Sequence, residues 1–153
     1  MREHPILAPP GGIVAPEHLP PGRRPIRVLF VVPDLRVGGA ERHVTTLSPR
    51  LDPERFTVSV VCIGDERGLF ADLPAAGIDA RALHLGGKLQ AVCALRGLVG
   101  QFRRARPDVV ILRGYNAEVL GRIAARIAGV QHTIMWMHNI GDPKPRSLVR
   151  TTV

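Results

Sequence analysis

The chain has 153 residues, a length that corresponds to one domain with a sizeable core. It carries 21 lysine and arginine residues against 13 aspartate and glutamate residues, a formal net charge of +8, but the arginines are scattered and only 4% of the residues are aromatic. A nucleic-acid surface built on base stacking is therefore disfavoured. The two cysteines, Cys62 and Cys93, form no Cys-x-x-Cys pair that would indicate zinc or redox chemistry, and we expect both to be reduced thiols in the core.

The sequence contains no pattern typical of membrane insertion or export. No apolar run approaches the roughly 18 residues that a membrane-spanning helix requires. The N-terminus lacks the apolar segment of a signal peptide. We therefore expect a cytoplasmic protein. The positive net charge leaves open, as an alternative, a peripheral association with an anionic membrane at its inner face.

Apolar runs and helical stretches alternate along the chain after a proline- and glycine-rich start. Residues 1–25 have a composition that forms neither strand ladders nor a core, so we expect a disordered extension. The apolar runs that we expect to be strands are 28–32, 56–63, 78–85, 109–112 and 130–137. The expected helices are 40–51, which Pro49 should shorten, 69–76, which Pro74 should weaken, 89–104 and 117–128.

This alternation predicts an α/β fold. Short loops and nearly all-apolar strands are typical of a doubly wound, mostly parallel Rossmann-like sheet with helices on both faces. In the two longest helices, periodicity predicts which large apolar residues face the core. In helix 89–104 they are Val92, Leu95, Val99 and Phe102, and in helix 117–128 they are Leu120, Ile123 and Ile127.

Two glycines, Gly38 and Gly39, lie between the first expected strand and the first expected helix. The first amides of a helix have no intrahelical partner, so a glycine turn at this place lets a phosphate approach the backbone closely. The spacing differs from G-x-G-x-x-G, and no Lys-Ser/Thr pair follows, which disfavours NAD and P-loop sites. A tight connection that binds nothing is an equally good interpretation of the glycines alone.

Polar residues follow the fourth and fifth expected strands, at the edge where ligands bind in such sheets. His138 comes directly after the fifth strand, although a single histidine more often satisfies a local hydrogen bond than performs chemistry. Arg113, Tyr115 and Asn116 follow the fourth strand and could hold hydroxyls or a phosphate. Asn116 is equally suited to be the N-cap of the next helix. No metal-ligand spacing stands out, and we expect no metal site.

Several segments carry a resemblance to a known family. The strings PDLRVGGAERHVTTL, RPDVVILRG and GRIAARIAGV, together with His138, resemble the N-terminal domain of family 4 glycosyltransferases, which have the GT-B fold. The resemblance covers residues 26–139, and we place the domain at 26–141. It implies a retaining transfer of a sugar from a nucleotide-sugar donor to an acceptor hydroxyl, with no cofactor besides that donor. Pro49 and Pro74 depart from the family pattern, because they lie within its helices.

The resemblance also implies roles for individual residues. Gly38 and Gly39 would face the donor pyrophosphate, and His138 would contact the donor sugar and help to position the reacting carbon without acting as the nucleophile. Arg36, Tyr115 and Asn116 would contact the acceptor, which in this family is a sugar, a lipid or a small molecule.

Family members carry a second Rossmann-like domain that grips the nucleotide, and we interpret residues 142–153 as a tail leading toward it. We therefore expect a partner domain in cis or in trans, and weak or no activity of this chain alone. The alternative is a non-catalytic Rossmann-like binding or interaction module.

Overall fold

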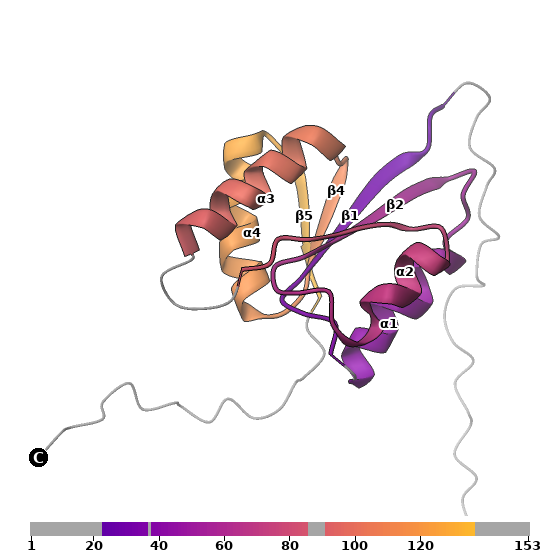
Figure 1. Ribbon diagram of the computed structural model, residues 1–153. Helices are drawn as coiled ribbons and strands as arrows, with labels where there is room; N and C mark the ends of the chain where they lie inside the picture. Colours follow the sequence, from indigo (N-terminus) through magenta and orange to yellow (C-terminus); the bar gives the residue numbers. More distant parts are fainter. Residues whose placement is uncertain (1–22, 37, 86–90, 137–153) are drawn as a thin grey trace, which may run out of the picture.

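A five-stranded parallel sheet forms the centre of the protein. The computed structural model describes residues 23–36, 38–85 and 91–136 (Figure 1). The strands are β1 (Ile26–Val32), β2 (Phe56–Cys62), β3 (Asp79–Ala82), β4 (Val109–Leu112) and β5 (His132–Met135). Their order is β3-β2-β1-β4-β5, and every neighbouring pair is parallel. The predicted doubly wound sheet is confirmed.

Helices cover both faces of this sheet. They are α1 (Gly39–Leu47), α2 (Asp72–Ala75), α3 (Ala91–Ala105) and α4 (Tyr115–Ala128), with short 3-10 turns η1 (Ser48–Arg50) and η2 (Gly68–Ala71). Helices α1 and α2 lie on one face, and α3 and α4 lie side by side on the other (Figure 1). As predicted, Pro49 accompanies an early end of α1, at Leu47, and α2, which contains Pro74, is only four residues long.

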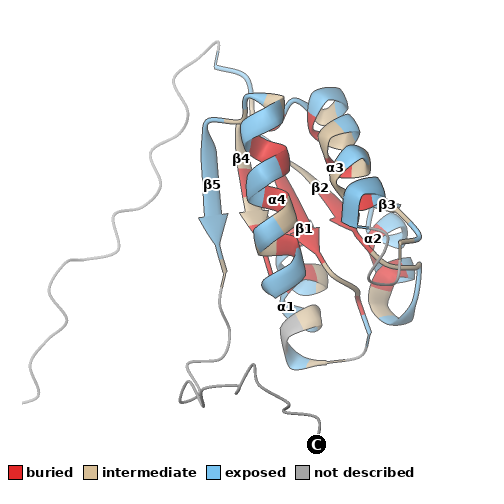
Figure 2. Ribbon diagram, turned by 90° about the vertical axis from the view of Figure 1, so that its left-hand side faces the viewer, coloured by how far each residue is buried: buried red, intermediate tan, exposed pale blue. Residues whose placement is uncertain are grey.

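Strand β1 connects the two halves of the core. Its alternate side chains point to opposite faces, as the period of a strand requires. Leu29 and Val31 pack in the cluster beneath α3 and α4, whereas Phe30 and Val32 pack in the cluster beneath α1 and α2. Val31 pairs with Val61 on one side and with Leu112 on the other, so β1 is buried between neighbours at its edges and its faces (Figure 2).

The buried faces of both long helices differ from those that periodicity predicted, although Phe102 is buried as predicted, and α4 presents only small residues to the sheet. The buried residues of α3 are Ala94, Leu98 and Phe102. Those of α4 are Ala117, Gly121, Ala124 and Ala125. The predicted inward positions Val92, Ile123 and Ile127 are exposed, so these assignments were wrong. The physical reason in α4 is its close approach to the sheet, because a Cβ at Gly121 would collide with the side chain of Leu112.

Two further predictions concern the chain ends and the cysteines. Residues 1–22 and the expected tail 142–153 lie outside the described residues. Arg24 is described and forms an ion pair with Asp108, so the end of the expected extension is attached to the domain. Cys62 is buried as predicted, but Cys93 is exposed on α3 and is no core thiol. None of the helices in the described residues combines the length and apolarity needed to cross a bilayer.

Candidate functional site

The carboxyl edge of the sheet brings two loops together. Strands β1 and β4 are neighbours, and the segments after Val32 and Leu112 leave the sheet side by side. Gly114 has a φ of +85°, and a Cβ at this position would lie only 2.7 Å from Pro33 Cγ. A side chain at 114 would therefore be both strained and crowded. Glycine at this position allows the loop after β4 to pack on the loop after β1.

The predicted glycine turn forms the start of α1. Gly38 is the N-cap and has an extended backbone, and Gly39 is the first helical residue. Among the described residues, no side chain caps this end of the helix, and none of their atoms lies within 4 Å of the position that a Cβ at Gly39 would take. The helix thus begins at the positive end of its dipole with space beside Gly39, while the Glu41 carboxylate lies beside Gly38. This is the backbone arrangement that an anion requires.

A buried ion pair fixes that turn to the sheet. Arg113 follows β4, and its Nη1 and Nη2 atoms lie 3.2 and 3.3 Å from Oε1 of Glu41 in the first turn of α1. The Arg113 side chain is only 8% exposed and that of Glu41 23%. The other oxygen of Glu41 occupies the space that a Cβ at Gly38 would take. Glycine at 38 leaves room for this carboxylate.

Sequence reasoning missed this pair. The position of Arg113 after the fourth strand suggests a ligand-binding residue, yet the structure directs it at Glu41. Opposite charges after the first and fourth strands, which are neighbours in a doubly wound sheet, are the signal that could have revealed the pair. The Nε of Arg113 is buried without a hydrogen-bond partner among the described residues.

The three expected acceptor residues lie on these two loops. The backbone N–H of Arg36 donates to Oδ1 of Asp34 at 3.3 Å, and its exposed side chain forms an ion pair with the same carboxylate. Tyr115 and Asn116 are exposed at the start of α4. The interpretation of Asn116 as an N-cap is wrong, because Gly114 is the N-cap and no side chain caps the helix. The exposed carboxamide of Asn116 is therefore not engaged in capping.

The predicted His138 lies outside the described residues, but the end of β5 that precedes it is described. The backbone N–H of Trp136 donates to the carbonyl of Leu112 at 2.9 Å. Its ring centroid lies 6.1 Å from that of His43 on α1 and 6.2 Å from that of Phe30. A cavity of about 250 Å³ lies beside Trp136 and His43. The segment after β5 therefore starts next to the helix that carries Gly38 and Gly39.

A reactive thiol is absent from this edge. Cys62 ends β2 close to the candidate site, and burial raises the pKa of its thiol to about 11, although a hydrogen bond from the backbone of Gly64 opposes this change. Because the thiolate is the nucleophilic form, a thiol with such a pKa is inert near neutral pH. In the part of the chain that the structure describes, no three His, Cys, Asp or Glu residues are grouped so that they could hold a metal ion.

The fold and this edge define the class of protein: a Rossmann-like α/β domain with an open glycine turn at the carboxyl ends of its strands. Comparison with protein families gives the particular assignment. Residues 38–152 match the model of the glycosyl transferase 4-like domain, and the chain belongs to this family. The match includes Gly38, Gly39, Glu41 and Arg113. The comparison with curated proteins finds no match.

Solved structures share the fold at low sequence identity. An O-GlcNAc transferase mutant from Thermobaculum terrenum has a TM-score of 0.60 and 16% identity, over 76% of this chain and 21% of that one. A UDP-N-acetylglucosamine 2-epimerase from Listeria monocytogenes has a TM-score of 0.54 and 17% identity, over 72% and 30%. The C-terminal domain of a hydrogenase from Pyrococcus furiosus has a TM-score of 0.51 and 13% identity, over 80% and 100%.

These structural similarities show the fold alone, as the hydrogenase domain illustrates. This chain spans less than a third of the transferase and of the epimerase. The family match confirms the predicted relation to the family 4 glycosyltransferases, and the structural similarities confirm the predicted Rossmann-like fold.

Proposed function

We propose that the chain is the acceptor-side domain of a retaining glycosyltransferase that moves a sugar from a nucleotide-sugar donor to an acceptor hydroxyl. The observation that carries this proposal is a helix that begins at Gly38 and Gly39 without a capping side chain among the described residues, within the segment that matches the glycosyltransferase family. The donor itself supplies the leaving group, and the proposal requires neither a metal nor a further cofactor.

The glycine turn would stabilise charge on the donor pyrophosphate. As the bond between sugar and phosphate breaks, negative charge grows on the phosphate oxygens, and fixed N–H dipoles stabilise this charge without reorganising. The Glu41–Arg113 ion pair supports this role, because it holds the first turn of α1 to the end of β4. The Oε2 atom of Glu41 lies beside Gly38, so the positive charge of Arg113 on Oε1 would offset the negative charge of this carboxylate next to the phosphate.

The remaining predicted residues would complete the site around that phosphate. His138 would contact the donor sugar, and its placement two residues after Trp136 supports this, because Trp136 lies against α1. Arg36, Tyr115 and Asn116 would contact the acceptor. All three side chains are exposed, which supports this role. Arg36 lies on the loop after β1, and Tyr115 and Asn116 lie at the start of α4, just after β4.

A second domain, in cis or in trans, would supply the grip on the nucleotide. The small fraction of the larger solved structures that the chain spans supports this part of the proposal. So does a set of exposed large apolar side chains on α4 and β5, which a folded partner could cover. They are Val119, Ile123, Ile127, Ile134 and Met135.

A titration of the ¹⁵N-labelled chain tests the phosphate site. UDP-N-acetylglucosamine, the nucleotide sugar in the name of the similar epimerase, is one suitable probe. We expect weak, saturable shifts of the Gly38 and Gly39 amides. Gly39→Ala should lower the affinity several-fold, because its methyl would occupy the open space beside the amides. Gly100→Ala is the matched control, since this exposed glycine on α3 also has nothing within 4 Å of its Cβ position.

Two outcomes would contradict the proposal. If a panel of nucleotide sugars shifts neither glycine amide, the phosphate role is wrong, and the non-catalytic binding module becomes the better interpretation. If the purified chain alone turns over a nucleotide sugar in the presence of an acceptor, the requirement for a second domain is wrong.

A further inference from the structure

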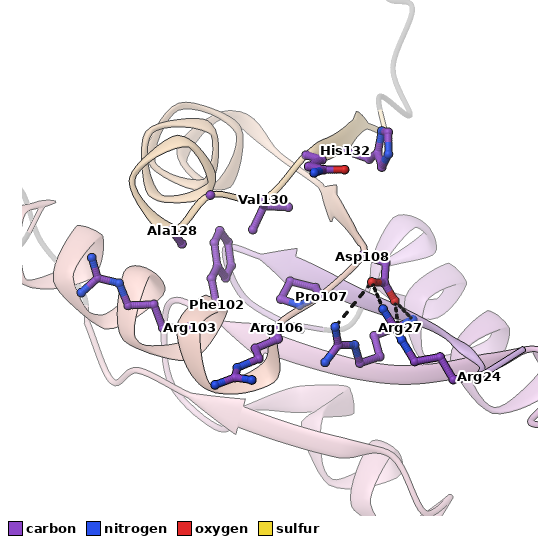
Figure 3. Close-up of a pocket in the computed structure, with 12 residues that line it drawn as sticks. Arg24, Arg27, Phe102, Arg103, Arg106, Pro107, Asp108, Ala128, Val130 and His132 are labelled. Atoms are coloured by element: carbon purple, nitrogen blue, oxygen red, sulfur yellow. Dashed lines mark hydrogen bonds and ion pairs between the residues drawn. The ribbon is translucent and has the colours of Figure 1, made fainter.

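A second, larger cavity lies at the other end of the sheet, where β1, β4 and β5 begin. It has a volume of about 740 Å³ and is lined by the segments that enter these strands and by the C-terminal ends of α3 and α4 (Figure 3). This volume is within the range of about 300–1,000 Å³ that is usual for small-molecule sites. Nothing in the proposed transferase chemistry uses this end of the molecule.

Four arginines line the cavity: Arg24, Arg27, Arg103 and Arg106. The single carboxylate in its wall, Asp108, is fully engaged. It accepts hydrogen bonds of 2.7 Å from both Nη atoms of Arg24 and one of 2.8 Å from the backbone N–H of Arg27 (Figure 3). These bonds, above all those from Arg24, hold the pKa of Asp108 well below its usual range, so the carboxylate remains charged.

Arg27 also shares the Asp108 carboxylate, since its Nη2 atom lies 3.5 Å from Oδ1, but the other two arginines of the wall differ. Arg103 and Arg106 lie on the α3 side of the cavity. Neither forms an ion pair with another of the described residues. The Nε of Arg27 is buried and has no hydrogen-bond acceptor in the part of the chain that the structure describes. Arg106 also has a φ of +45°, a left-handed conformation at a helix end where glycine is the usual residue.

A charge balance indicates the kind of ligand. Two helices end at the cavity, and each contributes about half a negative charge from its free carbonyls. Together with the Asp108 carboxylate, they leave about two of the four guanidinium charges uncompensated. A phosphate monoester carries about −1.5 to −2 charges near pH 7 and matches this excess. Guanidinium groups also suit phosphate geometry, because they can donate two parallel hydrogen bonds.

We propose that this cavity binds a small soluble phosphate monoester. Its phosphoryl group would be held at the buried Nε of Arg27 and by Arg103 and Arg106, whose exposed side chains point away from Arg27 (Figure 3) and would turn toward it on binding. The apolar part of the wall, which includes Phe102 and Val130, faces the organic part of the ligand. The site is distinct from the glycine turn, because it lies at the opposite ends of the same strands. It neither requires nor excludes the proposed transferase function.

Amide shifts of the ¹⁵N-labelled chain test the site, with inorganic phosphate and glycerol 3-phosphate as probes. We expect saturable shifts at Gly129, Gln131 and His132, which line the cavity. Glycerol alone, and sodium chloride at matched ionic strength, should not produce them. Arg103→Gln should weaken binding about tenfold, as expected for a lost hydrogen bond to a charged group. Arg96→Gln, an exposed arginine of α3 outside the cavity, should bind as the unchanged chain does.

Arg106→Gly separates loss of binding from loss of folding. Glycine accepts the left-handed backbone more readily than arginine does, so this variant should melt at the same temperature or higher and still bind phosphate about tenfold more weakly. If Arg106→Gly and Arg103→Gln both bind phosphate as tightly as the unchanged chain, the proposal is overturned. Shifts reproduced by sodium chloride alone would also overturn it.

Two further arms locate the source of the ligand. Gly39→Ala should not affect phosphate binding in the arginine cavity. A result that contradicts this cavity site can therefore be distinguished from one that contradicts the donor-phosphate site at the glycine turn. Vesicles of phosphatidic acid and phosphatidylcholine test a lipid source of the same phosphate group. Sedimentation with these vesicles that depends on Arg106, without any binding of glycerol 3-phosphate, would overturn the assignment to a soluble ligand.

Discussion

Arg113 and Glu41 form the ion pair on which the order of the glycine turn depends. We expect Arg113→Gln to lower the free energy of unfolding by about 2 kcal/mol, because it leaves the Glu41 carboxylate partly buried and unpaired. The exposed pair between Arg67 and Asp65, at 3.0 Å, is the matched control. Arg67→Gln should cost less than about 0.5 kcal/mol, because solvent screens an exposed pair. Urea denaturation measures both variants, and equal losses would show that burial of the first pair contributes nothing.

Asp108 gives a prediction on pH dependence. Its pKa in the folded protein is depressed, so its ion pair stabilises the fold above the unfolded pKa of about 3.9, and this contribution is lost as the pH falls through the folded pKa. Asp108→Asn should lower the free energy of unfolding by about 1 kcal/mol near neutral pH, a modest value because Arg24 is largely exposed.

Urea denaturation at several pH values checks this prediction. The difference between Asp108→Asn and the unchanged chain should narrow as the solution is acidified below the unfolded pKa of about 3.9. A difference that stays constant down to strongly acidic pH would show that the charge of Asp108 is not its cause.

At the scale of elements, two glycines at the ends of α4 allow the energetic cost of backbone strain to be measured apart from the cost of steric crowding. Gly114 and Gly129 both have a positive φ, of +85° and +75°, at the start and the end of α4. A Cβ at Gly129 would meet nothing within 4 Å, whereas a Cβ at Gly114 would meet Pro33. Gly129→Ala should cost about 1 kcal/mol from strain alone, and Gly114→Ala about 2–3 kcal/mol from strain and collision together. Thermal unfolding of the two variants compares them, and equal costs would remove the argument for tight packing between the two loops.

Helix α4 shows why hydrophobic periodicity misplaced a buried face. Ala124 is fully buried against the sheet, whereas its larger neighbour Ile123 is 45% exposed. We expect Ala124→Leu to destabilise the fold by about 1–3 kcal/mol through overpacking. Ile123→Ala should cost less than about 1 kcal/mol, because little of this side chain leaves water on folding. If denaturant midpoints show the reverse order, the orientation of α4 is wrong.

Much of the fold could be predicted from local patterns, and the failures have a common origin. The apolar runs that became β1, β2 and β4 are placed within two residues of their observed bounds, because buried parallel strands are almost entirely apolar. Side-chain direction in α3 and α4 depends instead on how closely each helix approaches the sheet. Small residues permit a close approach, and a pattern of large apolar residues does not detect them.

The candidate site could be predicted only in part. Gly38 and Gly39 are recognisable because the whole signal lies between one strand and the helix after it. The Glu41–Arg113 pair joins residues 72 positions apart, so it follows only from the strand order. The arginine cavity draws Arg24, Arg106 and Gln131 from three separate regions of the chain, and no local motif marks it. His138, which the family resemblance selected, stays a prediction.

At the scale of the whole molecule, the two edges of the sheet differ. Edge strand β3 carries the charged Asp79 and Arg81, which discourage pairing with another sheet. Edge strand β5 exposes Ile134 and Met135 and carries no formal charge apart from any on His132 (Figure 2). We therefore expect the chain to self-associate through β5 as its concentration rises.

Sedimentation velocity over a range of concentrations measures this association. Ile134→Lys should shift the chain toward the monomer, because a lysine on the edge strand opposes pairing. Val92→Lys alters an exposed apolar residue on α3, away from β5, and should change little. If both variants reduce association equally, the effect is one of net charge and not of the β5 edge.

The burial of β1 has a consequence for the dynamics of the candidate site. Phe30, Val31 and Val32 are completely inaccessible to solvent, and the strand has a parallel neighbour on each side. Its amides should exchange with deuterium only when the whole domain opens. The glycine turn starts a few residues after this strand and is held at its far end by Arg113. If the turn binds a phosphate as proposed above, the ligand would meet amides that are already oriented, and little conformational entropy would be lost at the moment of contact.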